Sequence, residues 1–127
     1  MTQSRNTALY LTDIMENIQN IELFTADGKE EFFHSIKTQY AVLKCLENIG
    51  EAIKNIPLEY KKLSDYPNWK TAAGTRDILI HHYFSVDTNL VWNIVVGDIP
   101  PLKSAVQQII SKLEQKDPPA EEPGMTI

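Results

Sequence analysis

The chain has 127 residues and a formal net charge of −5, so we expect one domain with a single hydrophobic core and no room for a second. The acidic balance argues against a general nucleic-acid coat protein, which needs an excess of surface cations. A single cysteine, Cys45, excludes an intramolecular disulfide and is typical of a reducing cytoplasm. We expect no signal peptide, because the N-terminus has no apolar h-region. We expect no membrane span, because no apolar run approaches about 20 residues.

Two helices are predicted in the first half of the chain. Apolar residues recur at three- and four-residue spacing from about Thr7 to Phe24, which indicates an amphipathic helix that ends at the turn Ala26-Asp27-Gly28. A longer helix is predicted from about Lys29 to Asn55, and Cys45 lies among its apolar positions as an inert core thiol. Its expected buried side consists of Phe32, Phe33, Ile36, Tyr40, Leu43, Leu46, Ile49 and Ile53.

Two residues late in this second helix stand out. Gly50 costs about 1 kcal/mol relative to alanine in a helix interior, so we expect a close helix crossing or a dimer contact there. Glu51 beside it is either a surface carboxylate or a supporting group that faces the polar cluster discussed below. The pattern slightly favours the surface.

Proline and glycine divide the second half of the chain. Pro57 to Pro67 is predicted to be a connector with one short helical turn around Leu58–Leu63. The small residues of Asn68–Gly74 predict a helix that can approach a neighbour closely. Asp87 is the expected N-cap of a short helix.

The C-terminal elements are predicted from the same kinds of signal, glycine and proline at the breaks and apolar spacing within the helices. Gly97-Asp98 and Pro100-Pro101 are predicted to close the short helix, and a final helix is expected from about Leu102 to Gln115. Residues 117–127 are rich in proline and acid and are predicted to be disordered. Since no stretch alternates as a strand, residues 1–116 are predicted to form an all-α, up-and-down bundle of four or five helices.

A polar cluster interrupts the helical pattern in the second half of the chain. Arg76, Asp77, His81 and Tyr83 lie close together around an apolar Ile-Leu-Ile run. Asp77 and His81 are four residues apart, so on a helix the carboxylate can orient the imidazole. Arg76 and Tyr83 share a neighbouring face, and the group could converge on one phosphate. The spacing Arg-x4-His also arises by chance, and a satisfied hydrogen-bond network that fixes a dimer is the plain structural alternative.

The residue types narrow the chemistry. A metal site is poorly supported and no cofactor is expected, because Asp77 and His81 supply only two ligands and His82 points away from its neighbour. His82 is instead expected to be a packing or surface residue. General acid–base catalysis by His81, with Arg76 stabilising negative charge, suits metal-independent cleavage of RNA.

The charge distribution and the single catalytic histidine add two expectations. Residues 54–76 have a balance of +3, which could receive an anion or could equally be a solvated turn region. One histidine cannot easily serve as base and acid on opposite sides of one phosphate. A symmetric homodimer solves this by bringing two copies of the cluster together across its two-fold axis.

The order of the motifs resembles a known family. The series Arg76-Asp77-x3-His81-x-Tyr83 is similar to the signature of HEPN-superfamily RNases, and more closely to HepT-type toxins of prokaryotic MntA–HepT toxin–antitoxin systems. The resemblance extends over nearly the whole chain except the tail. It continues through Ile49-Gly50-Glu51-Ala52, Tyr66-Pro67-x-Trp69, Gly74-Thr75, Leu79-Ile80, Phe84-x-Val86-Asp87, Val91-Trp92 and Asp98-Ile99-Pro100.

The resemblance implies a HEPN-like, α-helical homodimer that acts as the toxin of a type VII-like system. Arg76 and His81 would be the RNase pair, and Asp77 the polar supporting residue. Tyr83 matches the position that a nucleotidyltransferase antitoxin modifies with AMP. Such a modification adds negative charge and bulk beside Arg76 and would block an RNA phosphate.

A second class of function also fits these residues. The chain could be a non-catalytic helical dimer that binds a nucleotide, or an adaptor subunit that docks a nucleotidyltransferase onto its substrate. In that case Arg76 and His81 form a binding site, and expression should not arrest growth. Cleavage of RNA in EDTA that is lost on His81→Ala distinguishes the two hypotheses.

Overall fold

The structure is a computed structural model that describes residues 2–74 and 87–116. Every regular element within these ranges is helical, which confirms the predicted all-α class. Among the described residues, no helix is long and apolar enough to cross a membrane. In chain order the elements are α1 (Thr2–Phe24), α2 (Lys29–His34), α3 (Ile36–Lys54), α4 (Leu58–Lys61), helical residues 69–74, α6 (Thr88–Asn93), the π-helical turn η2 (Ile94–Asp98) and α7 (Ile99–Lys116).

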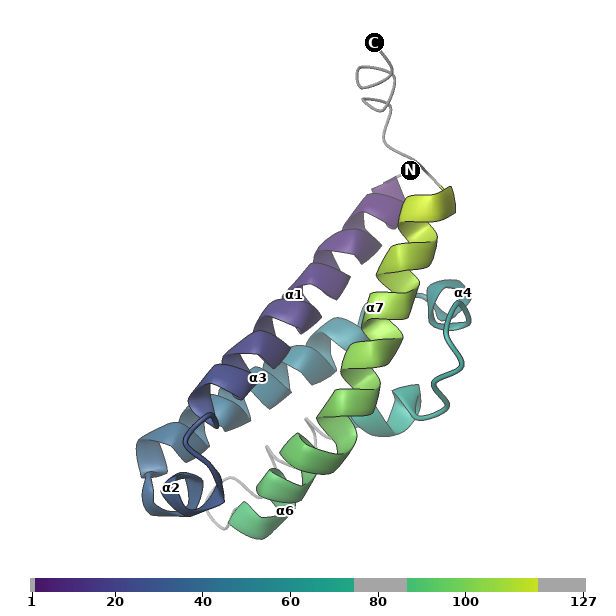
Figure 1. Ribbon diagram of the computed structural model, residues 1–127. Helices are drawn as coiled ribbons and strands as arrows, with labels where there is room; N and C mark the ends of the chain where they lie inside the picture. Colours follow the sequence, from purple (N-terminus) through teal and green to yellow (C-terminus); the bar gives the residue numbers. More distant parts are fainter. Residues whose placement is uncertain (1, 75–86, 117–127) are drawn as a thin grey trace.

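Three long helices form the bundle. Helix α1 packs along α3 and α7, and the start of α1 lies beside the end of α7, so these two helices run in opposite directions (Figure 1). Helices α2 and α6 lie together at the other end of the bundle, and α4 lies on the outer side of α7 (Figure 1). The core is made of the apolar stripes of the long helices, chiefly Leu11, Ile14, Ile18 and Ile21 from α1, Val42, Leu46, Ile49 and Ile53 from α3, and Leu102, Val106 and Ile109 from α7.

The predicted long helix from Lys29 to Asn55 is wrong, because the chain breaks at Ser35. Ser35 adopts an extended conformation, with φ of −120° and ψ of 102°, and its hydroxyl accepts a hydrogen bond from the Thr38 N–H at 3.1 Å. This is an N-cap, which starts a new helix and satisfies one of its free backbone donors. The Gln39 amide donates to the Phe32 carbonyl at 3.0 Å, closing the end of α2 from the far side of the break.

The break changes which side chains are buried. Phe32 in α2 is buried as predicted, whereas Ile36 and Tyr40 at the start of α3 are 65% and 53% exposed. A continuous helix would keep all three on one stripe. Because α2 and α3 differ in direction, the stripe of α3 begins only at Val42.

The second correction concerns Gly97-Asp98 and Pro100-Pro101, which do not close a helix. Neither proline has an N–H to donate to the carbonyl four residues earlier. The backbone instead widens into the π-helical turn η2 and continues into α7, which begins at Ile99 rather than Leu102. α6, η2 and α7 therefore follow one another without an intervening loop.

Several local predictions are confirmed. A single helical turn, α4, occurs in the connector after Pro57, and Asp87 caps α6. Cys45 is buried in α3, and Glu51 is exposed on the same helix. Gly50 is buried as well, and the close crossing or dimer contact expected there stays a prediction. α1 begins at Thr2, earlier than predicted, since no helix-breaking residue precedes Thr7. The predicted disordered tail, residues 117–127, lies outside the described residues.

Candidate functional site

The polar cluster predicted from the sequence lies outside the described residues. Arg76, Asp77, His81, His82 and Tyr83 all belong to residues 75–86, so their predicted roles stay predictions. The structure describes both flanks of this stretch, and it describes the surface beside the first flank.

Trp69 anchors the helical residues that lead into the cluster. Its side chain is 8% exposed, and the Tyr66 ring meets it edge-on with centroids 4.9 Å apart. The first turn is closed by the Ala72 N–H, which donates to the Asn68 carbonyl at 2.9 Å. The chain therefore reaches Gly74, two residues before Arg76, from a point fixed in the core.

The second flank is fixed in the same way. Asp87 accepts hydrogen bonds from the backbone N–H groups of Asn89 and Leu90 at 2.9 and 3.3 Å, and so caps α6. One turn later, Trp92 packs against Phe32 of α2, with ring centroids 5.2 Å apart. A buried or half-buried tryptophan thus holds each end of the stretch that carries the predicted catalytic residues.

A pocket lies beside the first flank, between α3, residues 66–72 and the junction of η2 with α7. It has about 60 Å³ of internal space and combines an apolar floor with a polar rim. The floor is formed by Leu46, Ile49, Ala72, Ile94, Ile99 and Leu102, and the rim by Tyr66, Asn68, Thr71 and Asp98. Burial raises the pKa of the Tyr66 phenol, and the negative charge of Asp98 raises it further.

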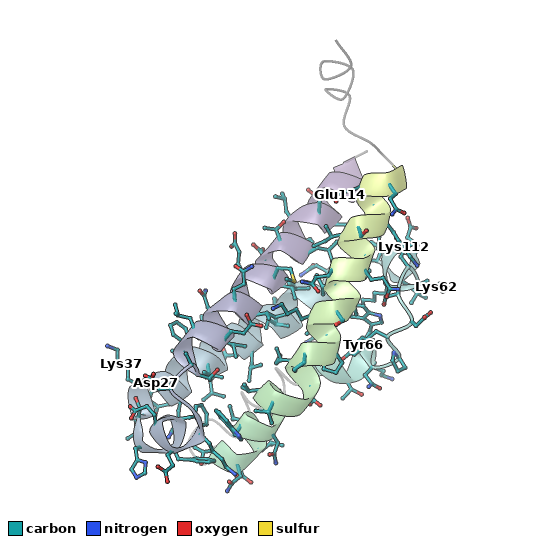
Figure 2. All side chains as sticks on the ribbon, viewed as in Figure 1. Asp27, Lys37, Lys62, Tyr66, Lys112 and Glu114 are labelled. Atoms are coloured by element: carbon teal, nitrogen blue, oxygen red, sulfur yellow. The ribbon has the colours of Figure 1, made fainter. Side chains whose placement is uncertain are left out.

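Exposed lysines lie on the side of the bundle that carries Tyr66. Lys62 and Lys70 are exposed, and partial burial lowers the pKa of Lys61. Figure 2 shows Lys62, Tyr66 and Lys112 on the same side of the molecule, along the connector and α7. Lys62 of the predicted basic span 54–76 and Lys112 of α7 therefore lie on the side of the bundle that carries the pocket residue Tyr66.

Two further residues singled out in the sequence have a described environment. Glu51 is exposed on α3, and its supporting role in catalysis stays a prediction. Cys45 is 5% exposed, and burial raises the pKa of its thiol, which disfavours the nucleophilic thiolate. Within residues 2–74 and 87–116, no three histidine, cysteine, aspartate or glutamate side chains are grouped so that they could hold a metal ion.

The pocket itself was missed by the sequence analysis. Asp98 was assigned to a turn, and Asn68 to the start of a helix, without any link between them. No local spacing connects them, because they meet only when α7 packs beside residues 66–72. Pro100-Pro101 marked a junction between elements but gave no link to Asn68.

The amino-acid sequence is similar to that of one known protein family. Residues 14–109 match the profile of the family described as HepT-like, "Ribonuclease HepT-like", a range that includes both flanks and the stretch between them. No solved structure matches the chain.

Three curated relatives illustrate the similarity. A protein of Methanocaldococcus jannaschii named "Gamma-glutamylcyclotransferase and putative RNase" is 43% identical over 87% of this chain, which spans only 50% of that protein. A "Putative RNase" of the same organism is 40% identical over 89% of this chain and 94% of its own length. A "Probable ribonuclease HepT" of Thermococcus cleftensis is 46% identical over 79% of this chain and 92% of its own length.

Proposed function

We propose, since the chain belongs to the HepT-like ribonuclease family, that it is a toxin that cleaves RNA without a metal ion, using Arg76, Asp77 and His81. The observation that carries the proposal is the motif Arg76-Asp77-x3-His81-x-Tyr83, which lies inside the matched range. The anchored flanks support it, because Trp69 and Asp87 fix the points between which the motif must lie.

The proposed reaction is attack of a ribose 2′-hydroxyl on its own phosphate. His81 takes the proton from the hydroxyl, and Asp77 orients the imidazole. The guanidinium of Arg76 stabilises the charge that develops on the phosphate oxygens. The leaving 5′-oxygen needs a proton from the opposite side, and the His81 of a second subunit supplies it in a symmetric dimer. Glu51 is proposed to support this site.

The proposal includes control by modification. In a type VII-like toxin–antitoxin pair, an MntA-type nucleotidyltransferase would transfer AMP to the Tyr83 hydroxyl. The added phosphate would be attracted to Arg76 and would occupy the place of the RNA phosphate. The modified protein should therefore bind RNA weakly and cleave it hardly at all.

The direct test is cleavage of a mixed-sequence RNA in the presence of EDTA. We expect the unmodified protein to cleave, and His81→Ala to lose at least a hundredfold in rate, as expected for loss of general acid–base catalysis. Equal melting temperatures of the two proteins would show that the fold is intact. Cleavage that stops with the chelator, or that survives in His81→Ala, would contradict the proposal.

Modification is tested separately by intact mass after co-expression with a neighbouring nucleotidyltransferase. AMP-sized increments should appear in the wild-type protein and be absent from Tyr83→Phe. Tyr40→Phe is a suitable control, because Tyr40 is an exposed tyrosine at the start of α3. Increments that persist in Tyr83→Phe would move the modification to another residue.

One observation favours a second candidate function, a non-catalytic nucleotide-binding or adaptor subunit of a nucleotidyltransferase. The pocket, with its apolar floor and the polar Asn68 and Asp98 at its rim, has the composition of a small-ligand site. Under this alternative the protein binds nucleotides but cleaves no RNA, and His81→Ala lowers binding rather than a cleavage rate.

A further inference from the structure

We propose that the pocket between α3, residues 66–72 and the junction of η2 with α7 binds one base of the RNA substrate, with guanine preferred through the Asp98 carboxylate. This inference rests on the proposed ribonuclease function and adds a determinant of where the RNA is cut. The residues proposed to contact the base all lie in the part of the chain that the structure describes.

The pocket can admit the edge of a planar ring. Its internal space of about 60 Å³ is too small to enclose a purine, since a cavity of about 150 Å³ is needed for benzene. One edge of the base therefore enters, and the rest of the nucleotide stays outside at the rim. Leu46, Ile49 and Leu102 in the floor are buried, so they offer a dry apolar surface to the ring. Tyr66 adds an aromatic edge at the rim, and unstacked RNA bases are commonly bound against such aromatic groups.

The polar rim favours a base that presents N–H groups. Asp98 is a carboxylate and therefore only accepts hydrogen bonds, and it repels a phosphate. Guanine presents two adjacent donors, N1–H and the N2 amino group, which match the two oxygens of one carboxylate. The Asn68 amide can donate to the neighbouring guanine O6. Adenine and cytosine present only an amino group on this edge, and uracil only one imino N–H.

The surroundings suit the rest of the RNA chain. Lys62 and Lys112 are exposed on the side of the molecule that carries Tyr66 (Figure 2), and Lys70, which follows Asn68 by two residues in the sequence, is exposed as well. Cations are therefore available for the phosphates that flank a bound base. Arg76 follows Thr71 by five residues, so their Cα atoms are at most about 18 Å apart whatever the conformation between them. A base in the pocket is therefore within a few nucleotides of a phosphate held by Arg76.

The first test measures the binding of the four 5′-ribonucleotides to the full chain. Equilibrium dialysis gives the amount retained, and tryptophan fluorescence reports a change at the pocket. Trp69 contacts Tyr66 at the pocket, and the Trp92→Phe background removes the other tryptophan. We expect GMP to bind best and to cause a saturable change in Trp69 fluorescence in the Trp92→Phe background. GMP that is not retained in dialysis, or GMP that is retained without any change in Trp69 fluorescence, would overturn the proposal.

The second test assigns the recognition to the rim. Asp98→Asn should weaken GMP binding about tenfold, the loss of one charge-assisted hydrogen bond, and bring it close to that of AMP. Asp27→Asn is the matched control, because Asp27 is exposed and lies well apart from Tyr66 (Figure 2). Should Asp98→Asn fold poorly, Asn68→Ser keeps a capping residue before the helix and removes only the amide. Unchanged GMP binding in both variants would refute the assignment.

The third test separates this inference from the proposed function. Cut sites mapped on a mixed-sequence RNA should lie at a fixed offset from guanine in the wild-type protein and lose that preference in Asp98→Asn, with KM raised more than kcat is lowered. If the wild type cleaves without any base preference, the pocket proposal fails and the ribonuclease stands. If GMP binds through Asp98 but no RNA is cleaved, the ribonuclease fails and the pocket stands.

Discussion

Asp98, the last residue of the π-helical turn, shares one pocket with Tyr66, and its charge adds to burial in raising the pKa of the Tyr66 phenol. The two residues belong to segments far apart in the sequence. They meet because η2, which ends at Asp98, leads directly into α7 beside residues 66–72, and because Trp69 anchors the segment that carries Tyr66.

This relationship predicts a specific dependence on pH. The unfolded phenol ionises near pH 10 and the folded phenol above it, so the folded state holds the extra proton between these values. The free energy of unfolding should therefore decline as the pH rises from about 10 through the folded pKa of Tyr66. The difference between the ultraviolet titration curves of the wild type and Tyr66→Phe gives the midpoint of Tyr66 ionisation in the folded protein. Asp98→Asn should lower that midpoint partway, because burial is the larger cause; a midpoint that stays unchanged would contradict the assigned charge effect.

The side-chain cap of Asp87 should contribute measurably to the free energy of unfolding. Asp87→Ala removes the acceptor for the Asn89 and Leu90 N–H groups, and should lower the free energy of unfolding by about 1 kcal/mol. Asp27→Ala, an exposed turn residue, is the control and should have a smaller effect. Urea unfolding followed by circular dichroism measures both. Equal effects would mean that the side chain of Asp87 does not act as a cap.

Leu9 and Leu11 on the same helix form a matched pair for testing the core. Leu11 is fully buried against α3 and α7, and Leu9 is 57% exposed. Leu11→Ala should cost about 2–5 kcal/mol in the free energy of unfolding, whereas Leu9→Ala should change it by less than about 0.5 kcal/mol. A larger loss for Leu9→Ala than for Leu11→Ala would mean that the buried face of α1 is the one that carries Leu9, which contradicts the structure. A large effect of Leu9→Ala alone would show that this exposed side is covered in solution.

The thiol of Cys45 should be protected by the fold. It is 5% exposed with a raised pKa, so at neutral pH it should react with iodoacetamide far more slowly than a free thiol. In denaturant it should react at the ordinary rate. Mass spectrometry of quenched samples measures both rates. Rapid labelling of the native protein would contradict the burial of this side chain.

The amphipathic stripes of the long helices could be predicted from the sequence, because burial in this fold follows the helical period over many residues. Leu11, Ile14 and Ile18 illustrate this in α1. The break at Ser35 could not be placed in the same way, because the residues around it continue the apolar spacing. A serine N-cap gives a weak local signal that only the packing of α2 against α3 and α6 makes decisive.

Only part of the candidate site could be predicted from the sequence. The predicted catalytic residues belong to one ordered series of motifs, so Arg76 and His81 could be proposed from the sequence, and their roles stay predictions. The pocket could not, because Asp98 and Asn68 are brought together by tertiary packing. Glu51 shows a third case, in which the spacing correctly favoured an exposed position but left its role open.

The most direct test of the central claim is the activity of mixed dimers. Wild-type and His81→Ala subunits are unfolded together, refolded at varied ratios and assayed for RNA cleavage in EDTA, with a mixture of wild type and Asp27→Asn as the control. If two histidines from two subunits serve one phosphate, activity falls with the square of the wild-type fraction, leaving about one quarter in an equal mixture. A linear fall, with half of the activity retained, would show that each subunit cleaves RNA on its own.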